Sequence, residues 1–156
     1  MSKTFTFTRS VLAPYSAEMV YSVINDVPNY HRFLPNCQGS GVLSRTAEAD
    51  GERVLGYMDL GLLGLSYRLE SNNLHHTPHS IDMNLSKGPF EFLRGHWQIT
   101  TLSADGCKVA LNMTWAYNSI MLATIMGQRF ESIASQLLDA FMAETAKRAS
   151  LSNGKA

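Results

Sequence analysis

The 156-residue sequence predicts an α+β fold, in which a curved antiparallel sheet of about six or seven strands wraps around a long C-terminal helix. Three observations predict it. Residues 38–117 read as consecutive strands joined by short turns, which is typical of an antiparallel meander. Residues 118–148 carry apolar side chains three or four positions apart, as an amphipathic helix does. A helix packed across the concave face of the sheet buries both apolar surfaces at once.

The first elements are a strand and two short helices. Residues 4–12 alternate apolar side chains with threonine or serine, the pattern of a half-buried strand. Ser16 can cap the helix that follows, and Pro28 ends it. Residues 29–35 suit a single helical turn.

Turn sequences then divide the middle of the chain. The segments EADG, GLLG, HHTP, KGP and SADG separate six strands, which we expect at residues 38–47, 52–60, 64–73, 79–87, 91–102 and 106–117.

The C-terminal helix is too long for the sheet. If it were continuous over 118–148 it would extend about 46 Å, whereas a ten-residue strand extends about 33 Å. We therefore expect a bend near Gly127 or a later start. The sequence predicts one domain over residues 1–150 and a disordered tail at 151–156.

Bulk composition limits the function classes. Thirteen basic and thirteen acidic residues give a formal net charge of zero, so no global field favours nucleic acid or anionic lipid. The N-terminus lacks a signal-peptide pattern, and no apolar run is long enough to span a bilayer. We expect a cytoplasmic protein, peripheral at the inner membrane if it contacts lipid. Cys37 and Cys107 are far apart, which does not favour a disulfide or a metal knuckle.

The segment SKGPFEFLRGHW, residues 86–97, combines a turn with a gap. Gly88 and Pro89 punctuate the sheet, and Leu93, Gly95 and Trp97 then share one strand face. A glycine in that position leaves space where a side chain normally fills the core. Trp97 and Trp115, on strands expected to be adjacent, form either an aromatic wall for a ligand or an aromatic core pair.

Three segments carry a family likeness: APYSAEMVYSVINDVPNYHRFLP, GPFEFLRGHW, and WAY before the long helix. Together they resemble the START-like (helix-grip) superfamily, and within it the coenzyme Q-binding and RatA (ribosome association toxin) branch, often labelled polyketide cyclase/dehydrase-like. The resemblance covers roughly residues 3–148. It implies a cavity between sheet and helix that holds a hydrophobic ligand, in this branch a ubiquinone-like isoprenoid. It also implies an alternative, because RatA members bind the 50S ribosomal subunit and block 70S formation.

Strand alternation and helical spacing then predict which residues line that cavity. The inward sets include Leu65, Leu69, Ile81, Leu85 and Ile99 as general core. The residues predicted to contact the ligand are Tyr67, Met83, Leu93, Trp97, Met113, Trp115, Tyr117, Met121, Ile125, Met126, Phe130 and Ile133.

Two apolar segments have two interpretations each. Leu62 and Leu63 lie in a turn that is either tucked into the core or exposed as a membrane-contacting or entrance loop. Residues 119–126 form either a helix end buried by the sheet or a lid that admits a lipid.

Other chemistries have less support. A cyclase needs ionisable groups converging in the cavity, and only Tyr67 and Tyr117 offer protic groups among the inward sets, so we predict no enzyme and no catalytic residue. His75, His76 and His79 suggest a metal, but they fit a solvated hairpin better, so we predict no metal. We also predict no cofactor apart from the lipid, and no DNA partner.

Ribosome binding depends on cations gathered on a surface. The outward faces of adjacent strands can gather Arg68, Arg94 and Lys108. This partner otherwise rests on the resemblance.

Overall fold

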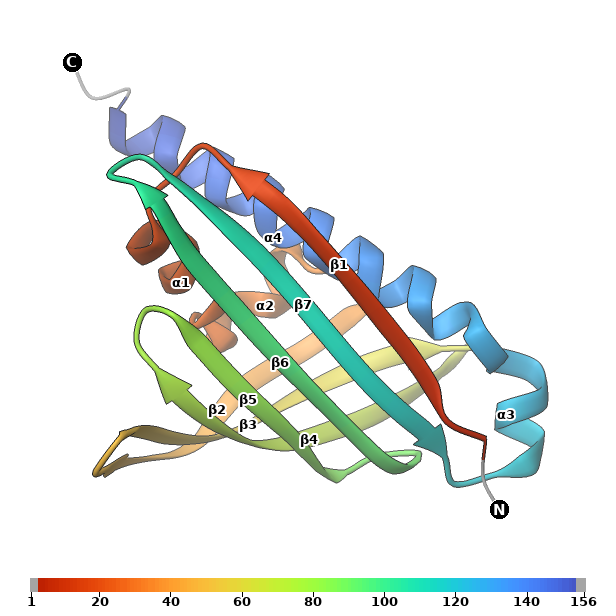
Figure 1. The fold of residues 1–156 in the computed structure, drawn as a ribbon. Helices are drawn as coiled ribbons and strands as arrows, with labels where there is room; N and C mark the ends of the chain where they lie inside the picture. Colours follow the sequence, from red (N-terminus) through yellow and green to blue (C-terminus); the bar gives the residue numbers. More distant parts are fainter. Residues whose placement is uncertain (1–2, 154–156) are drawn as a thin grey trace.

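The computed structural model describes residues 3–153 of the chain. A seven-stranded antiparallel sheet has the order β1-β7-β6-β5-β4-β3-β2, so the first strand lies beside the last and the rest form a meander (Figure 1). The strands are β1 Phe5–Ala13, β2 Cys37–Glu48, β3 Gly51–Leu62, β4 Leu65–His76, β5 Ser80–Lys87, β6 Phe90–Ser103 and β7 Gly106–Tyr117. The α+β prediction is confirmed, with each strand within a few residues of its expected bounds.

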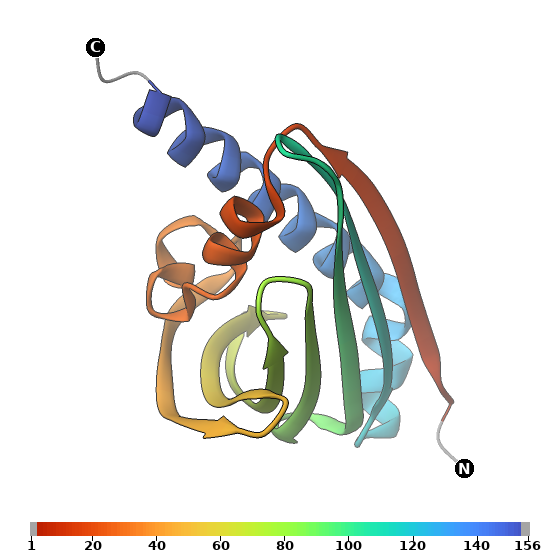
Figure 2. The same ribbon diagram turned by 60° about the vertical axis from the view of Figure 1, so that its left-hand side comes forward.

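The sheet curves around the helices on its concave side (Figure 2). Register shifts interrupt the pairing of β2 with β3 and of β6 with β7, and such irregularities let a sheet bend sharply. The curvature turns β2 to β5 away from the long C-terminal helix, which runs alongside β1 and β7 (Figure 1).

Short helices fill the corner between β1 and β2. Helix α1, Ala17–Ile24, begins where the Ser16 hydroxyl accepts a hydrogen bond from the Met19 amide. A 3₁₀ turn, η1 Val27–Asn29, and the single-turn helix α2 Tyr30–Phe33 follow it. Both predicted helices are confirmed.

The C-terminal helix is broken as expected. Helix α3, Ile120–Met126, ends at Gly127, where φ is 47°, and the 3₁₀ turn η2, Gly127–Arg129, leads into α4, Phe130–Asn153. A left-handed residue interrupts the helical hydrogen-bond ladder and redirects the chain. Helix α4 continues through residues 151–153, so the predicted tail is wrong there, and 154–156 lie outside the described residues. No helix within 3–153 is long and apolar enough to cross a membrane.

Helix α4 is held along one side of the sheet. Arg9 of β1 donates hydrogen bonds to Ser135 and pairs with Asp139 at 2.7 Å. Near the other end of α4, Arg148 pairs with Asp26 and Glu144, each at 2.9 Å. These contacts fix α4 to β1 and to the turn before α2. Cys37 and Cys107 are both buried free thiols, as the sequence indicates.

Candidate functional site

At the α3 end, aromatic side chains fill the space between sheet and helix. The Trp115 and Phe130 ring centroids lie 5.2 Å apart, and Phe90 packs on both Phe130 and Tyr117. The Tyr117 hydroxyl donates to the Gly127 carbonyl at 2.7 Å, and burial raises the pKa of Tyr117. Met126, at the end of α3, is buried beside this cluster. This end of the interior is closed by packing.

The second tryptophan belongs to a different cluster. Trp97 meets Phe141 of α4 edge-on at 5.4 Å. It pairs with Leu111 on β7, whereas Trp115 pairs with Leu93. Four positions along a strand correspond to about 13 Å, so the two indoles form no continuous wall. That part of the prediction is wrong, and both tryptophans are core residues.

The gap at Gly95 is occupied. A Cβ built on Gly95 would lie 2.4 Å from the Met83 Cε atom and 3.5 Å from the Met113 Cγ atom. The Met83 side chain therefore leans from β5 towards β6 and takes the space that Gly95 leaves. The glycine accommodates a neighbouring methionine.

Between α4 and the strands β3, β4 and β5 the apolar interior is incompletely covered, and this part-buried surface is called the groove below. Several apolar side chains pack against the core from both walls and yet stay only partly buried. On α4 these are Ile133 and Leu137, which lie on the side of the helix opposite the Arg9 contacts. On the strands they are Met58, Tyr67, Met83 and Leu85. Solvent reaches this apolar interior, whereas the Trp115 cluster is sealed.

The inner face of β4 becomes polar towards the β4–β5 hairpin. Ser71 is half-buried, and Asn73 and His75 are buried. The Tyr21 hydroxyl lies 2.8 Å from His75 Nδ1 and accepts a hydrogen bond from Thr77. Burial lowers the pKa of His75 to about 4, and Arg45 adds to the shift.

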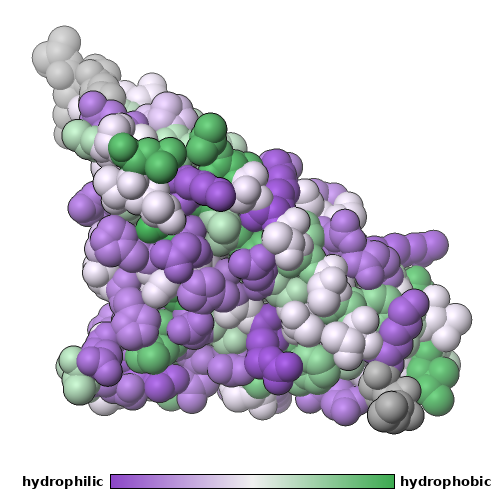
Figure 3. Space-filling view, in the orientation of Figure 1, coloured by the Kyte–Doolittle hydropathy of each residue, from purple (hydrophilic) through white to green (hydrophobic). Residues whose placement is uncertain are grey.

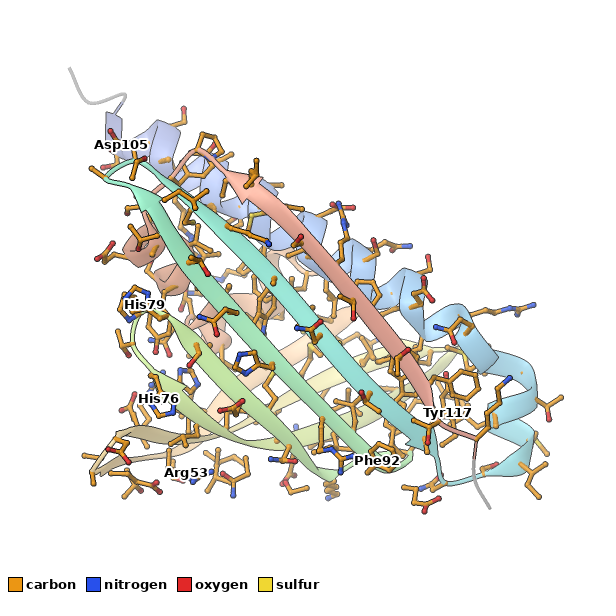
Figure 4. All side chains as sticks on the ribbon, in the orientation of Figure 1. Arg53, His76, His79, Phe92, Asp105 and Tyr117 are labelled. Carbon is orange, nitrogen blue, oxygen red and sulfur yellow. The ribbon has the colours of Figure 1, made fainter. Side chains whose placement is uncertain are left out.

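Sequence reasoning missed this polar strip. The alternation of β4 places residues 71, 73 and 75 on the same face as Tyr67 and Leu69, and continuing the inward set past Leu69 would have found them. The solvated-hairpin prediction is wrong for His75. It holds better for His76 and His79, which lie at the hairpin end, away from Tyr117 (Figure 4). No group of three metal-ligating side chains occurs within the described residues.

Two residues predicted for the ligand site lie on the surface instead. Met121 is 71% and Ile125 43% exposed, because α3 buries only Leu122 and Met126. Leu65, expected to point inward, is also exposed. Apolar surface is visible at the α3 end of the molecule, at the lower right of Figure 3.

The β3–β4 turn is partly tucked into the core and partly exposed, so each of the two interpretations holds for one of its leucines. Leu62 is buried, whereas Leu63 is 51% exposed and has a left-handed φ of 55°. With Gly64 at φ 77° it forms a two-residue hairpin turn, where asparagine or glycine is the usual first residue. A leucine here pays a conformational cost of about 1–2 kcal/mol.

An open depression lies between α3 and the start of β1. It encloses about 460 Å³ and is lined by Lys3, Phe5, Ile120, Ala123 and Gln128 among others. The Phe5 and Tyr117 rings, which pack against each other, form part of its lining.

Cations on the outer sheet face are mostly paired. Arg68 binds Asp59 at 2.8 Å and Arg53 binds Glu48. Arg94 stacks over the Phe92 ring instead.

The predicted gathering of outer-face cations does not occur. Arg94 aligns through Asn84 with Asn72 of β4, four positions from Arg68. Lys108 pairs with Thr100, six positions from Arg94.

Comparisons with known proteins identify a family model and several relatives that are similar to this chain. Residues 13–142 match the family model described as polyketide cyclase / dehydrase and lipid transport. The ribosome association toxin RatA of Escherichia coli K12 is 33% identical over 134 residues, covering 86% of this chain and 82% of that protein. The mitochondrial coenzyme Q-binding protein COQ10 of Drosophila melanogaster is 25% identical over 91% of this chain and 59% of its own length.

A solved structure supports the same fold. The Zhui aromatase/cyclase from Streptomyces superposes with a TM-score of 0.78 at 16% identity, over 94% of this chain and 96% of that one. An identity this low shows the fold alone. Together with the family model and the two relatives, it shows that the chain belongs to the polyketide cyclase/dehydrase and lipid-transport family of the START-like superfamily, in the branch that contains RatA and COQ10.

Proposed function

We propose that this protein binds a hydrophobic ligand, a ubiquinone or related isoprenoid lipid, in the groove between α4 and strands β3 to β5, in support of respiratory quinone function. The observation that carries the proposal is the incomplete burial of apolar side chains on both walls, Ile133 and Leu137 on α4 and Met58 and Leu85 on the strands. Apolar surface left open to water inside a fold is stabilised when an apolar ligand covers it. The name of the COQ10 relative points to the same ligand class.

Transient membrane contact fits the exposed apolar residues. Leu63 is held in a strained turn conformation, and Ile120 of α3 is 88% exposed. Exposed leucine and isoleucine at one end of a molecule suit contact with a bilayer surface. In this proposal the protein stays cytoplasmic and meets the inner membrane to exchange its lipid.

The interior offers little for catalysis. Tyr117 is hydrogen-bonded to Gly127, and Tyr21 and His75 are paired with each other. Tyr67, the remaining predicted protic group, lies among apolar neighbours on β4. The titratable side chains that do lie together, Tyr21 and His75, are buried and hydrogen-bonded to each other, so neither is open to a substrate as acid–base chemistry requires. We therefore propose a binding protein in preference to a cyclase; pH-dependent turnover lost in Tyr67→Phe would reverse this.

Native mass spectrometry with organic extraction tests the ligand. Protein purified from cells that make ubiquinone is expected to carry a quinone, and Ile133→Trp is expected to lose it because the larger side chain fills the groove. Leu12→Trp, an exposed position on β1, is the matched control. Protein that stays empty after incubation with quinone-containing vesicles would refute the proposal.

A second candidate is association with the 50S ribosomal subunit. The observation that favours it is the RatA relative, 33% identical over 86% of this chain. Paired outer-face cations such as Arg68 with Asp59 do not favour RNA binding. Co-sedimentation with purified 50S subunits, and its loss in higher salt, tests this candidate independently of lipid content.

A further inference from the structure

The depression between α3 and the start of β1 has a mixed lining. Phe5, Ile120 and Ala123 supply apolar surface, and most of the other lining residues carry hydrogen-bonding side chains. The Lys3 Nζ atom lies 5.2 Å from the centre of the Phe5 ring. The volume of about 460 Å³ is within the range of small-molecule sites, about 300–1,000 Å³. A lining of this kind suits an amphipathic molecule with a polar head and an apolar body.

Some polar groups of the depression are already engaged. The Thr124 hydroxyl donates to the Ile120 carbonyl at 2.8 Å. The Gln128 amide donates to the Thr6 carbonyl at 3.0 Å. The Ser119 oxygen caps α3 by accepting a backbone hydrogen bond, so its hydroxyl proton can still be donated to a ligand.

The groups that can meet a ligand are mainly donors, and the charge of the lining is positive. Lys3 is the one charged residue among the described residues that line the depression, and Asn118 adds an exposed side-chain amide. Outside it, the exposed Arg129 and Glu131 carry opposite charges and offset each other. An ammonium, an amide and a hydroxyl donor together suit the acceptor oxygens of a phosphate, which carry negative charge.

Helix α3 presents an apolar face beside the depression. Ile120, Met121 and Ile125 are 88%, 71% and 43% exposed, and at 3.6 residues per turn they lie within about 140° of the helix surface. Ile120 also lines the depression. Neighbouring apolar side chains left in solvent mark contact with a partner or a membrane. The surface of a bilayer offers both an apolar phase for this face and phosphate groups for the depression.

We propose that the depression binds the phosphate head group of an anionic phospholipid while Ile120, Met121 and Ile125 enter the bilayer surface. The inference rests on the membrane contact in the proposed function, and it does not depend on a ligand in the groove. Lys3 and Ser119 bind the phosphate oxygens. Apolar side chains at an interface enter about 5–10 Å below the head groups, so Ile120 brings the rim of the depression to the level of the phosphates.

The charge of the lining favours anionic over zwitterionic lipids. A phosphatidylcholine head also carries a phosphate, but its quaternary ammonium group would lie beside the Lys3 ammonium. Like charges at short distance repel each other. A head group with a net negative charge has no such repulsion.

Flotation with vesicles tests the inference. The full chain is mixed with vesicles of phosphatidylcholine alone, or of equal parts phosphatidylcholine and phosphatidylglycerol. We expect about fivefold tighter binding to the vesicles that contain phosphatidylglycerol. Ile120→Ser is expected to weaken binding to both vesicles about tenfold, because an apolar contact is lost. Leu12→Ser, 75% exposed near the other end of β1, is the matched control.

A variant that fills the depression separates a head-group site from general attraction by charge. Thr124 is exposed and lines the depression, so Thr124→Trp occupies the space without changing any charge. We expect it to bind both vesicles without the preference for phosphatidylglycerol, and Lys3→Gln to lose the preference too. Lys108→Gln, at an exposed position of β7, is the control and keeps it. A preference that survives in Thr124→Trp would refute the head-group site.

The outcomes separate this inference from the proposed function. A wild type that binds neither vesicle refutes the membrane contact and the head-group site together, whereas quinone extraction tests the groove by itself. Equal binding to both vesicles refutes the head-group site alone. Millimolar inorganic phosphate is expected to leave the flotation unchanged, because it cannot replace the apolar contacts of Ile120 and Met121. Release of the protein by phosphate would show that the depression takes a free anion instead of a lipid.

Discussion

Replacing Gly95 with alanine tests the packing at the centre of the sheet. The new methyl group would lie 2.4 Å from the Met83 Cε atom, far inside contact distance, and 3.5 Å from the Met113 Cγ atom, which is ordinary contact. Only the end of Met83 has to move. Overpacking of this kind costs about 1–3 kcal/mol.

The lower conformational freedom of alanine has the opposite effect on the stability of the folded protein. Alanine is favoured over glycine within a strand by about 0.5–1 kcal/mol, because glycine loses more conformational freedom on folding. We therefore expect Gly95→Ala to lower the free energy of unfolding by about 1 kcal/mol, which corresponds to about 2–4 °C in the melting temperature for a domain of this size.

In the Met83→Ala variant, we expect Gly95→Ala to have the opposite effect on the free energy of unfolding. Without the Met83 methyl group the added Cβ fills empty space, and Gly95→Ala should raise the free energy of unfolding by about 0.5–1 kcal/mol. Urea unfolding, followed by circular dichroism, of the wild type, both single variants and the double variant measures the coupling. Equal effects of Gly95→Ala in the two backgrounds would show that Met83 does not occupy the space beside it.

Three further perturbations follow from the structure. His75 has a folded pKa of about 4 against 6.5 in the unfolded chain. Its stabilising contribution is therefore present above about pH 6.5 and is lost as the pH falls towards 4. The urea midpoints measured at about pH 7 and pH 4.5 should differ less in His75→Gln than in the wild type. Leu62→Ala should cost about 2–5 kcal/mol, because Leu62 is buried, and a cost near zero would place it outside the core. Leu63→Asn should stabilise the turn by about 1 kcal/mol in thermal unfolding and slow quinone transfer from vesicles; an unchanged transfer rate would exclude membrane contact by this turn.

The order and type of the elements could be predicted because local signals agreed with the fold. Each turn between strands is marked by glycine, proline or aspartate, and the strands between them alternate. The break at Gly127 was predictable from length alone, since an unbroken helix would have extended beyond the sheet.

Side-chain placement in α3 was not predictable. Residues 120–126 are apolar on nearly every side, so the periodicity does not say which face is buried. The Gly127 geometry turns Leu122 and Met126 towards β7 and leaves Met121 and Ile125 in solvent. Tertiary structure decides this, and no local pattern records it.

The polar residues of β4 were misjudged for a different reason. Histidine and asparagine beside a hairpin are usually solvated, which made the exposed interpretation of His75 reasonable. Burial is possible here because α1 brings the Tyr21 hydroxyl within 2.8 Å of His75. That partner is 54 residues away in the sequence, so the compensating hydrogen bond is invisible to a reading of β4 alone.

The apolar side chains between α4 and strands β3 to β5 are only partly buried because the ion pairs of α4 hold it along one side. Arg9 and Arg148 hold it to β1 and to the turn at Asp26, and no ion pair among the described residues joins it to β3, β4 or β5. Covering the open apolar walls contributes about 2.5 kcal/mol per 100 Å², whereas association costs about 4–15 kcal/mol in lost freedom. A tail must cover several hundred Å² merely to offset that cost.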